Sequence, residues 1–227
     1  HLLFDRLMSA EQKAMYLKSF VDDEDFHLAF AGTTAEQGLG WTYHRDAYED
    51  EIVVPTAVKQ GKDWVLNGRI EAVANAPLAK LFAVQVRTSA GSKGAKGLST
   101  FLIARDAAGF KVCDTIKAFS GEGGSMTRWH HGTAAAIELK DCKVSAAQLL
   151  GKEGACPFAD GKLMARAAVA NAAVSLGVGR ASYDAAVDYA KIRRQGGRNI
   201  IEHQAIGTKL ADCTIKLELA QIGRAHV

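Results

Sequence analysis

The stretch YAKIRRQGGRNIIEHQAIGTKLAD, residues 189–212, decides the fold of the C-terminal part of the chain. Its first residues end an alanine-rich segment, residues 158–194, with few turn residues, which predicts a long helix packed closely among other helices. The turn at residues 196–199 ends that helix. A second, antiparallel helix is then predicted from the apolar positions that follow, among them Ile201, Ala205, Leu210 and Leu217.

Upstream of this helix pair, residues 27–145 are rich in β-branched residues and short alternating runs. Turn-forming segments separate these runs, with no helix between them, so we expect an antiparallel sandwich or barrel. Strands are predicted at residues 51–60, 63–73, 80–88, 98–106, 110–116 and 135–144. The expected core includes Leu66, Phe82, Val84, Val86, Phe101 and Ile103.

The N-terminal residues predict one short helix. Ser9 is suited to cap a helix over residues 10–20, with Gln12 as its capping-box partner. The fold class is therefore α+β. We expect three parts: the end of a helical domain at residues 1–26, a β domain at 27–148, and the start of a second helical domain at 149–227.

Composition describes a globular chain of 227 residues with 48% apolar residues and a net charge of +3. The Lys and Arg residues are scattered, which indicates a solvated surface and argues against a nucleic-acid partner. No apolar run approaches the roughly 18–20 residues of a membrane span. The four cysteines are far apart, without a CxxC pair, and no signal peptide is evident, which is typical of reduced thiols in a cytoplasmic protein.

Both ends of the sequence resemble cuts. The chain begins at His1 without Met, inside a helical pattern, and stops at Val227 inside another. The last six residues, IGRAHV at 222–227, resemble translated sequencing-adapter sequence, and we expect them not to be native. We therefore expect an internal fragment of a longer protein.

Two local patterns suggest chemistry only weakly. GSKGAKG, residues 91–97, resembles a phosphate loop, but no Ser or Thr follows its lysine, which favours a flexible hairpin loop. His130 and His131 are adjacent in an expected strand and point to opposite faces, which argues against a metal ion shared with Cys142. We predict no metal site.

The order of the zones and several motifs resemble the acyl-CoA dehydrogenase family. The segments SAEQKAMYL (9–17), WVLNGRIEAVANAPLAKLFAVQVRT (64–88), GLSTFLIARDAAGFKV (97–112) and KDCKVSAAQLLGKEG (140–154) are similar to its successive motifs. Residues 189–212 match its pattern Y-A-x-x-R-x-x-F-G-x-x-I-x-x-x-Q-x-I-x-x-x-L-A-D without a gap. The resemblance implies an antiparallel β-barrel or sandwich domain followed by an up-down helical bundle, truncated here.

The resemblance also implies an activity. The family uses FAD to remove two hydrogens from the Cα–Cβ bond of an acyl-CoA thioester, with a carboxylate taking the α proton. An oxidoreductase of fatty acid metabolism is implied, with an electron-transfer partner and a homo- or hetero-tetramer. No catalytic residue is assigned, because most members place the base beyond residue 227 and a minority near Ala165. The nearest acid, Asp160, is interpreted as a surface residue at a helix start.

The segment FAGTTAEQGLG, residues 30–40, resembles the family's cofactor turn F-A-x-T-E-P-x-x-G-S-D. Thr33 and Gly38 match it, whereas Leu39 replaces the serine that hydrogen-bonds the FAD pyrophosphate. The family's aromatic-Ile-Thr/Ser triplet, which covers the flavin and hydrogen-bonds its N5 region, reads Ala72-Val73-Ala74 here. Cofactor contacts are expected from Thr33, Gly38 and Ala74.

Two residues near the helix pair match family residues that reach the FAD of a neighbouring subunit, namely Arg193 and Gln204. The phenylalanine that accompanies them in the family is Gly196 here. The family's arginine for acyl-CoA falls at Ala168, so Arg166 lies out of register and is expected to bind substrate only after a local shift.

Three functions stay open from the sequence. The primary hypothesis is a fragment of a divergent FAD-dependent acyl-CoA dehydrogenase, one subunit of a heteromer. The alternative is a non-catalytic, FAD-poor structural or interaction subunit of such a complex. A third hypothesis, a related flavin monooxygenase or nucleic-acid-binding relative, is disfavoured for nucleic acid by the modest, unclustered charge.

Overall fold

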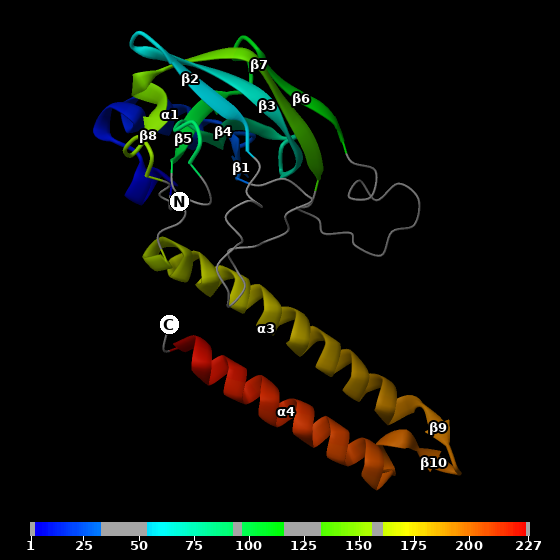
Figure 1. Cartoon of the computed structure of the whole chain (residues 1–227). Helices are drawn as coiled ribbons and strands as arrows, with labels where there is room; N and C mark the ends of the chain where they lie inside the picture. The colour runs from blue at the N-terminus through cyan, green and yellow to red at the C-terminus, as the bar shows by residue number, and fades with distance from the viewer. Residues whose placement is uncertain (1–2, 33–53, 93–96, 116–132, 156–160, 226–227) are drawn as a thin grey trace. The chain divides into compact units, whose positions relative to one another are not determined.

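The computed structural model describes residues 3–32, 54–92, 97–115, 133–155 and 161–225, and in α3 and α4 it leaves the side chains of residues 161–168, 171, 224 and 225 undescribed. The chain divides into two compact units, His1–Ala159 and Asp160–Val227. The first holds the N-terminal helix and the β domain, and the second holds a pair of long helices (Figure 1).

The first unit begins with a π-helical turn, η1 (Leu3–Leu7), and helix α1 (Ala10–Asp22). The predicted capping box is confirmed, since Gln12 N donates to Ser9 Oγ at 3.2 Å and Ser9 N donates to Gln12 Oε1 at 3.1 Å. Phe4 and Met8 pack on the outer face of the sheet, in a cluster with Leu81, Ala83, Leu102 and Leu150.

Eight strands form the β domain, in the order β6-β7-β3-β2-β4-β5-β8, with β1 added beside β4 (Figure 1). Their bounds are β1 His27–Ala31, β2 Thr56–Gln60, β3 Asp63–Ala74, β4 Ala79–Arg87, β5 Leu98–Ala104, β6 Phe110–Thr115, β7 Ala134–Ser145 and β8 Leu149–Leu150. The six strands predicted from alternation correspond to β2 through β7.

The sheet is mixed rather than purely antiparallel. β1 runs parallel to β4, from Leu28 opposite Leu81 to Ala31 opposite Val84, and β2 meets β4 in parallel at Thr56 and Arg87. Strands joined by a tight hairpin must be antiparallel, whereas β1 and β4 are separated by two other strands along the chain. The turn signals that predicted antiparallel neighbours therefore do not constrain this pair.

The predicted core of the β domain is confirmed. All six predicted residues are fully buried. Two of them pack against further aromatic rings: the ring centroids of Phe101 and Trp64 lie 5.8 Å apart, and those of Phe82 and Phe110 lie 4.7 Å apart. Each buried large apolar side chain contributes about 1.5–3 kcal/mol to stability. This core fixes the strands on which the candidate site is built.

The chain leaves the β domain through residues 145–154, which are held by side chains from three directions. Gln148 Nε2 donates to Leu102 O at 2.9 Å, and Lys59 Nζ lies 3.4 Å from Glu153 Oε2. Gln12, only 3% exposed, donates from Nε2 to Ala147 O at 2.8 Å and to Leu149 O at 2.9 Å. Helix α1 is thereby fastened to the exit segment.

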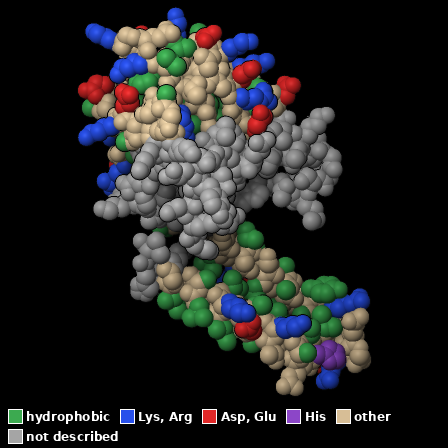
Figure 2. Space-filling view, in the orientation of Figure 1, with side chains coloured by type: hydrophobic (Ala, Val, Ile, Leu, Met, Phe, Trp, Pro, Cys, Tyr) green, Lys and Arg blue, Asp and Glu red, His purple; other side chains and the backbone are tan. Residues whose placement is uncertain are grey.

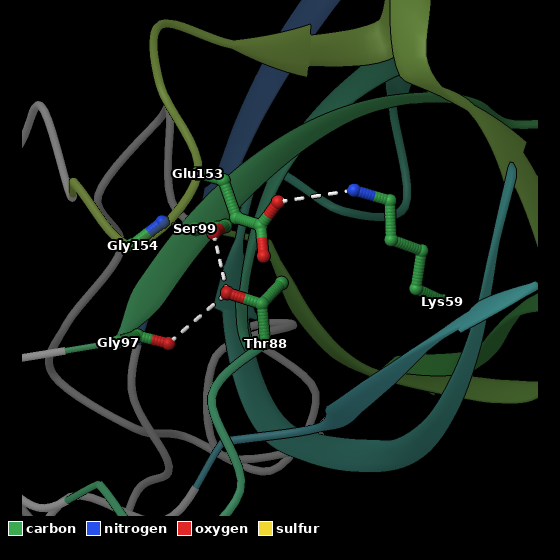
Figure 3. A network of polar contacts seen from close by, with 6 residues as sticks. All are labelled: Lys59, Thr88, Gly97, Ser99, Glu153 and Gly154. Atoms are coloured by element: carbon green, nitrogen blue, oxygen red, sulfur yellow. Dashed lines mark hydrogen bonds and ion pairs between the residues drawn. The ribbon is translucent and has the colours of Figure 1, made fainter. Parts of the chain in front are cut away.

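A chain of hydrogen bonds connects the exit segment to the β4–β5 connection (Figure 3). Gly154 N donates to Ser99 Oγ at 2.9 Å, the Ser99 and Thr88 hydroxyl oxygens lie 2.7 Å apart, and Thr88 Oγ1 donates to Gly97 O at 3.2 Å. Because Thr88 gives its hydrogen to Gly97, Ser99 is the donor between the two hydroxyls. All the bonds thus run in one direction, and the two segments are held together at the surface of the sheet.

The second unit is a helical hairpin of α3 (Gly161–Ile192) and α4 (Gln204–Ala225), which confirms the predicted long helix from residue 161 onward. The helices meet through Thr214 Oγ1 and Tyr183 OH at 2.7 Å and through Arg180 and Glu218 at 3.1 Å. Apolar side chains remain exposed along both helices (Figure 2), including Val174, Val178, Ile192, Ile215 and Leu219. No helix among the described residues is long and apolar enough to cross a membrane.

Candidate functional site

The β-domain part of the candidate site begins at the end of β1. Thr33 and Gly38 lie outside the described residues, so the structure describes the approach to the predicted cofactor turn as far as Gly32. A Cβ at residue 32 would lie 2.5 Å from Phe30 Cζ and 2.8 Å from Gln85 Oε1. A larger residue at position 32 would displace these side chains, so glycine allows the close approach seen here.

The end of β3 carries the other predicted cofactor segment of this unit. Val73 is buried in the core, whereas Ala74 is exposed and lies opposite Ala134 of β7. Their ladder has an irregularity between Ile70 and Val73. Ala74 offers only a methyl group, so hydrogen bonding at this position is limited to its backbone.

In the second unit, a short hairpin joins α3 to α4 and positions Arg193 and Gln204. Strands β9 (Arg194–Gln195) and β10 (Arg198–Asn199) are linked by Gly196 and Gly197, whose φ angles are 60° and 82°. Positive φ at both central residues is the geometry of a type I′ turn, which glycine adopts without strain. The 3₁₀ turn η6 (Ile200–Glu202) follows and leads into α4.

Backbone and side-chain bonds hold this connection in place. Arg193 N donates to Tyr189 O at 2.9 Å, and Arg193 O accepts from Ile200 N at 2.8 Å. His203 Nε2 lies 2.9 Å from Gln195 O. The end of α3 and the start of α4 are thus fixed relative to each other.

Arg193 and Gln204 lie at the same end of the helical hairpin, and both are exposed. Within the described part of the chain, neither side chain forms a hydrogen bond or ion pair with another residue. A guanidinium and a carboxamide supply N–H donors, a set suited to phosphate oxygens. Both residues therefore present side-chain N–H donors to solvent at this end of the hairpin.

The structure describes only some of the other residues for which a role was predicted. Arg166 lies within α3, but its side chain is outside the described residues. His130 and His131 are also outside them, and no cluster able to hold a metal ion occurs among the residues that are described. Burial raises the pKa of the Cys142 thiol, which favours the protonated form and disfavours metal binding.

One residue of this region was not singled out from the sequence. Asn75, directly after Ala74, has a φ of 66° and bonds to the backbone of β1 through its side chain. The available signal was an Asn between the end of a strand and the next turn, since Asn tolerates positive φ better than most residues.

Two family models match the chain. The model described as acyl-CoA dehydrogenase, middle domain, matches residues 48–133, and that described as acyl-CoA dehydrogenase, C-terminal domain, matches residues 159–226. The first match falls on the β domain and the second on the helical hairpin. Their order is that of the two units of the structure.

Curated relatives and a solved structure agree with these matches. A 3-(aryl)acrylate reductase of Clostridium sporogenes (strain ATCC 15579) is 34% identical over 212 residues, which are 93% of this chain and 51% of the relative. The caffeyl-CoA reductase-Etf complex subunit CarC of Acetobacterium woodii is 32% identical over 218 residues, 93% of this chain and 51% of the relative. The structure titled "PigA with FAD and proline" superimposes with a TM-score of 0.78 at 25% identity, over 96% of this chain and 52% of that one.

The chain spans about half the length of the curated relatives it matches. Within that span, the β domain, the exit segment and the helical hairpin follow the order of the two matched domains. The chain therefore belongs to the acyl-CoA dehydrogenase family.

Proposed function

We propose that the protein is an FAD-dependent enzyme that removes two hydrogens from the Cα–Cβ bond of an acyl-CoA thioester. Family membership supports this reaction class. The observation that carries the proposal is the exposed donor pair Arg193 and Gln204 on a fixed connection between two helices. Arginine pairs with phosphate oxygens in a bidentate geometry, which suits the pyrophosphate of FAD.

The residues present fit FAD better in the second unit than in the first. Arg193 and Gln204 supply donors, and we propose that they hold the cofactor of a neighbouring subunit in a homo- or hetero-tetramer. Ala74 has lost the side-chain hydroxyl that the family places near flavin N5, and Thr33 and Gly38 would contribute through their turn. When bound, FAD supplies the acceptor for the hydride that leaves the β carbon.

We further propose an acyl-CoA substrate and an electron-transfer partner. The name of the Acetobacterium relative includes a caffeyl-CoA substrate and an Etf complex. Reduction of a conjugated C=C bond adds two hydrogens to the carbons from which a dehydrogenase removes them, so the two reactions place similar demands on a site. We assign Arg166 to acyl-CoA binding as part of this proposal.

The alternative is a non-catalytic, FAD-poor subunit of an acyl-CoA dehydrogenase complex. Two features favour it: the exposed methyl of Ala74 and the leucine at position 39 where the family has a serine. Each lost hydrogen bond weakens binding by about 0.5–1.5 kcal/mol, and more when the partner is a charged phosphate. Such a chain would serve FAD sites mainly through Arg193 and Gln204.

The deciding experiment measures flavin per chain from the visible spectrum of the full-length protein. The protein is produced alone and together with a family subunit whose cofactor turn is intact. We expect little flavin in the first case and a yellow complex in the second. Bleaching of the flavin band by acyl-CoA under anaerobic conditions would then establish the enzymatic reaction.

Replacement of Arg193 tests the carrying observation. Arg193→Ala removes charge-assisted hydrogen bonds worth about 1.5–3 kcal/mol, so FAD affinity of the complex should fall about tenfold to 150-fold. Lys191→Ala is the matched control, because Lys191 is exposed nearby and, among the described residues, its ion-pair partner is Asp188. Equal flavin loss in both variants would contradict the proposed role. Full FAD occupancy in the protein produced alone would contradict the FAD-poor alternative.

A further inference from the structure

The two cofactor-related segments of the first unit come from strands that do not pair with each other. β1 pairs with β4, whereas β3 pairs with β2 and β7, and β1 packs against β3 without a shared ladder (Figure 1). A hydrogen bond connects β1 to the residue that directly follows β3. It runs from Asn75 Nδ2, just after β3, to Leu28 O of β1, at 3.0 Å.

The conformation of Asn75 allows this bond. Its φ of 66° lies in the left-handed region, which Asn adopts more readily than most residues. Its backbone N donates to Thr133 O at 2.7 Å, at the start of β7, and its carbonyl accepts from Leu78 N at 3.1 Å and Ala79 N at 2.9 Å. One residue therefore ties the end of β3 to β7, to the start of β4 and to β1.

The turn that follows Asn75 is held by a second, independent set of bonds. Arg105 donates from Nη1 to Ala76 O at 2.9 Å and to Ala79 O at 3.1 Å. We therefore expect the turn to stay closed when the Asn75 side chain alone is removed. This makes the contribution of the side-chain amide separable from that of the backbone.

We propose that Asn75 is a positioning residue for the cofactor site. Its amide holds β1, which carries Phe30 and leads to Gly32, in place beside the end of β3, where the Ala72–Ala74 segment lies. It acts through the Leu28 carbonyl and touches neither cofactor nor substrate. The inference rests on the proposed function for the identity of the ligand, FAD, but the tie between the strands rests on the hydrogen bonds alone.

The test compares two substitutions at Asn75 with one at Asn67, a second Asn associated with β3. Asn75→Gly keeps the positive φ and loses the donor, while Asn75→Asp keeps the side-chain size and donates only when protonated. Asn67→Gly is the control, since Asn67 makes two cross-strand bonds to Asp141 away from Ala74. Hydrogen exchange and FAD affinity are measured on the full-length protein in the assembly that binds flavin.

We expect Asn75→Gly to speed exchange of the β1 amides and to weaken FAD binding about twofold to tenfold. Asn67→Gly should leave both unchanged. Asn75→Asp should bind FAD weakly at neutral pH and recover in mild acid, because a protonated carboxyl donates to Leu28 O again. Asn75→Gly should show no such recovery.

Two results would overturn the proposal. Unchanged exchange of β1 in Asn75→Gly would show that the amide does not hold the strand, whatever the ligand. Faster exchange with unchanged FAD affinity would remove the link to the cofactor site. A wild-type protein that binds no FAD in any assembly would refute the proposed function and the cofactor role, and the exchange result would still decide the strand tie.

Discussion

The Gln12 side chain makes one local and two long-range hydrogen bonds. Its side-chain oxygen closes the capping box with Ser9, and its nitrogen donates to two backbone carbonyls, Ala147 O and Leu149 O. The first role follows from the local pattern of Ser9 and Gln12 and was predicted from sequence. The second joins residues far apart in the chain, and no local pattern indicates it. A residue's long-range partners depend on the packed fold and not on its neighbours in sequence.

Gln12→Ala is expected to lower the free energy of unfolding by about 1.5–4.5 kcal/mol, because it removes three side-chain hydrogen bonds: the one that Gln12 Oε1 accepts from Ser9 N and the two that Nε2 donates to Ala147 O and Leu149 O. Chemical denaturation of the full-length protein measures this loss. Lys13→Ala serves as the control, since Lys13 is half-buried on the same helix and, among the described residues, its side chain makes a single 3.5 Å contact, with Asp5 O. A Gln12→Ala variant as stable as Lys13→Ala would contradict this account.

Among the elements, strands β2 to β7 could be predicted from the sequence, whereas the parallel pairing of β1 with β4 could not. Short apolar runs bounded by turn residues explain why β3 and β4 were predicted with nearly correct bounds, although β4 is buried at consecutive positions and not on one face alone. The parallel placement of β1 depends on contacts with a strand much later in the chain. β8 is too short, at two residues, to carry a periodic signal.

The packing of α3 against α4 leads to a prediction about two glycines of α3. A Cβ at Gly179 would lie 3.0 Å from Leu217 Cδ2 of α4, whereas a Cβ at Gly177 would meet nothing within 4 Å. Gly-to-Ala changes inside helices stabilise by about 0.5–1 kcal/mol where there is room. We therefore expect Gly177→Ala to raise the melting temperature of the full-length protein.

Gly179→Ala should gain less than Gly177→Ala, or nothing, because Leu217 has to move to accommodate the methyl group. The two variants control for each other, since both glycines lie in the same helix with the same backbone preference. Equal stabilisation of both would show that α4 does not approach α3 closely at this point.

In the molecule as a whole, the apolar side chains of α3 and α4 have more exposure than a soluble helix pair usually leaves. Ile192 is 75% exposed, Leu219 62% and Ile215 59%. Contiguous apolar surface promotes association. We expect the 227-residue chain, produced by itself, to bind a hydrophobic dye and to sediment as oligomers or aggregates.

Lysine substitutions test the origin of this association. Ile215→Lys combined with Leu219→Lys should reduce dye binding and shift sedimentation toward the monomer. Val58→Lys should not, because Val58 is similarly exposed, at 61%, but lies on β2 of the other unit. A monodisperse wild-type chain that binds no dye would refute the expectation.

The paired glycines between β9 and β10 also bear on how this lineage can change. Where the family has phenylalanine, Gly196 has a φ of 60°, and a Cβ there would lie 3.2 Å from Cε1 of His203. A bulky residue is strained at positive φ, and His203 is already engaged with Gln195 O. A single change to phenylalanine at position 196 would therefore strain the turn and crowd His203. The turn itself would have to change before this position could carry an aromatic side chain, so the glycine pair restricts which substitutions the hairpin tolerates.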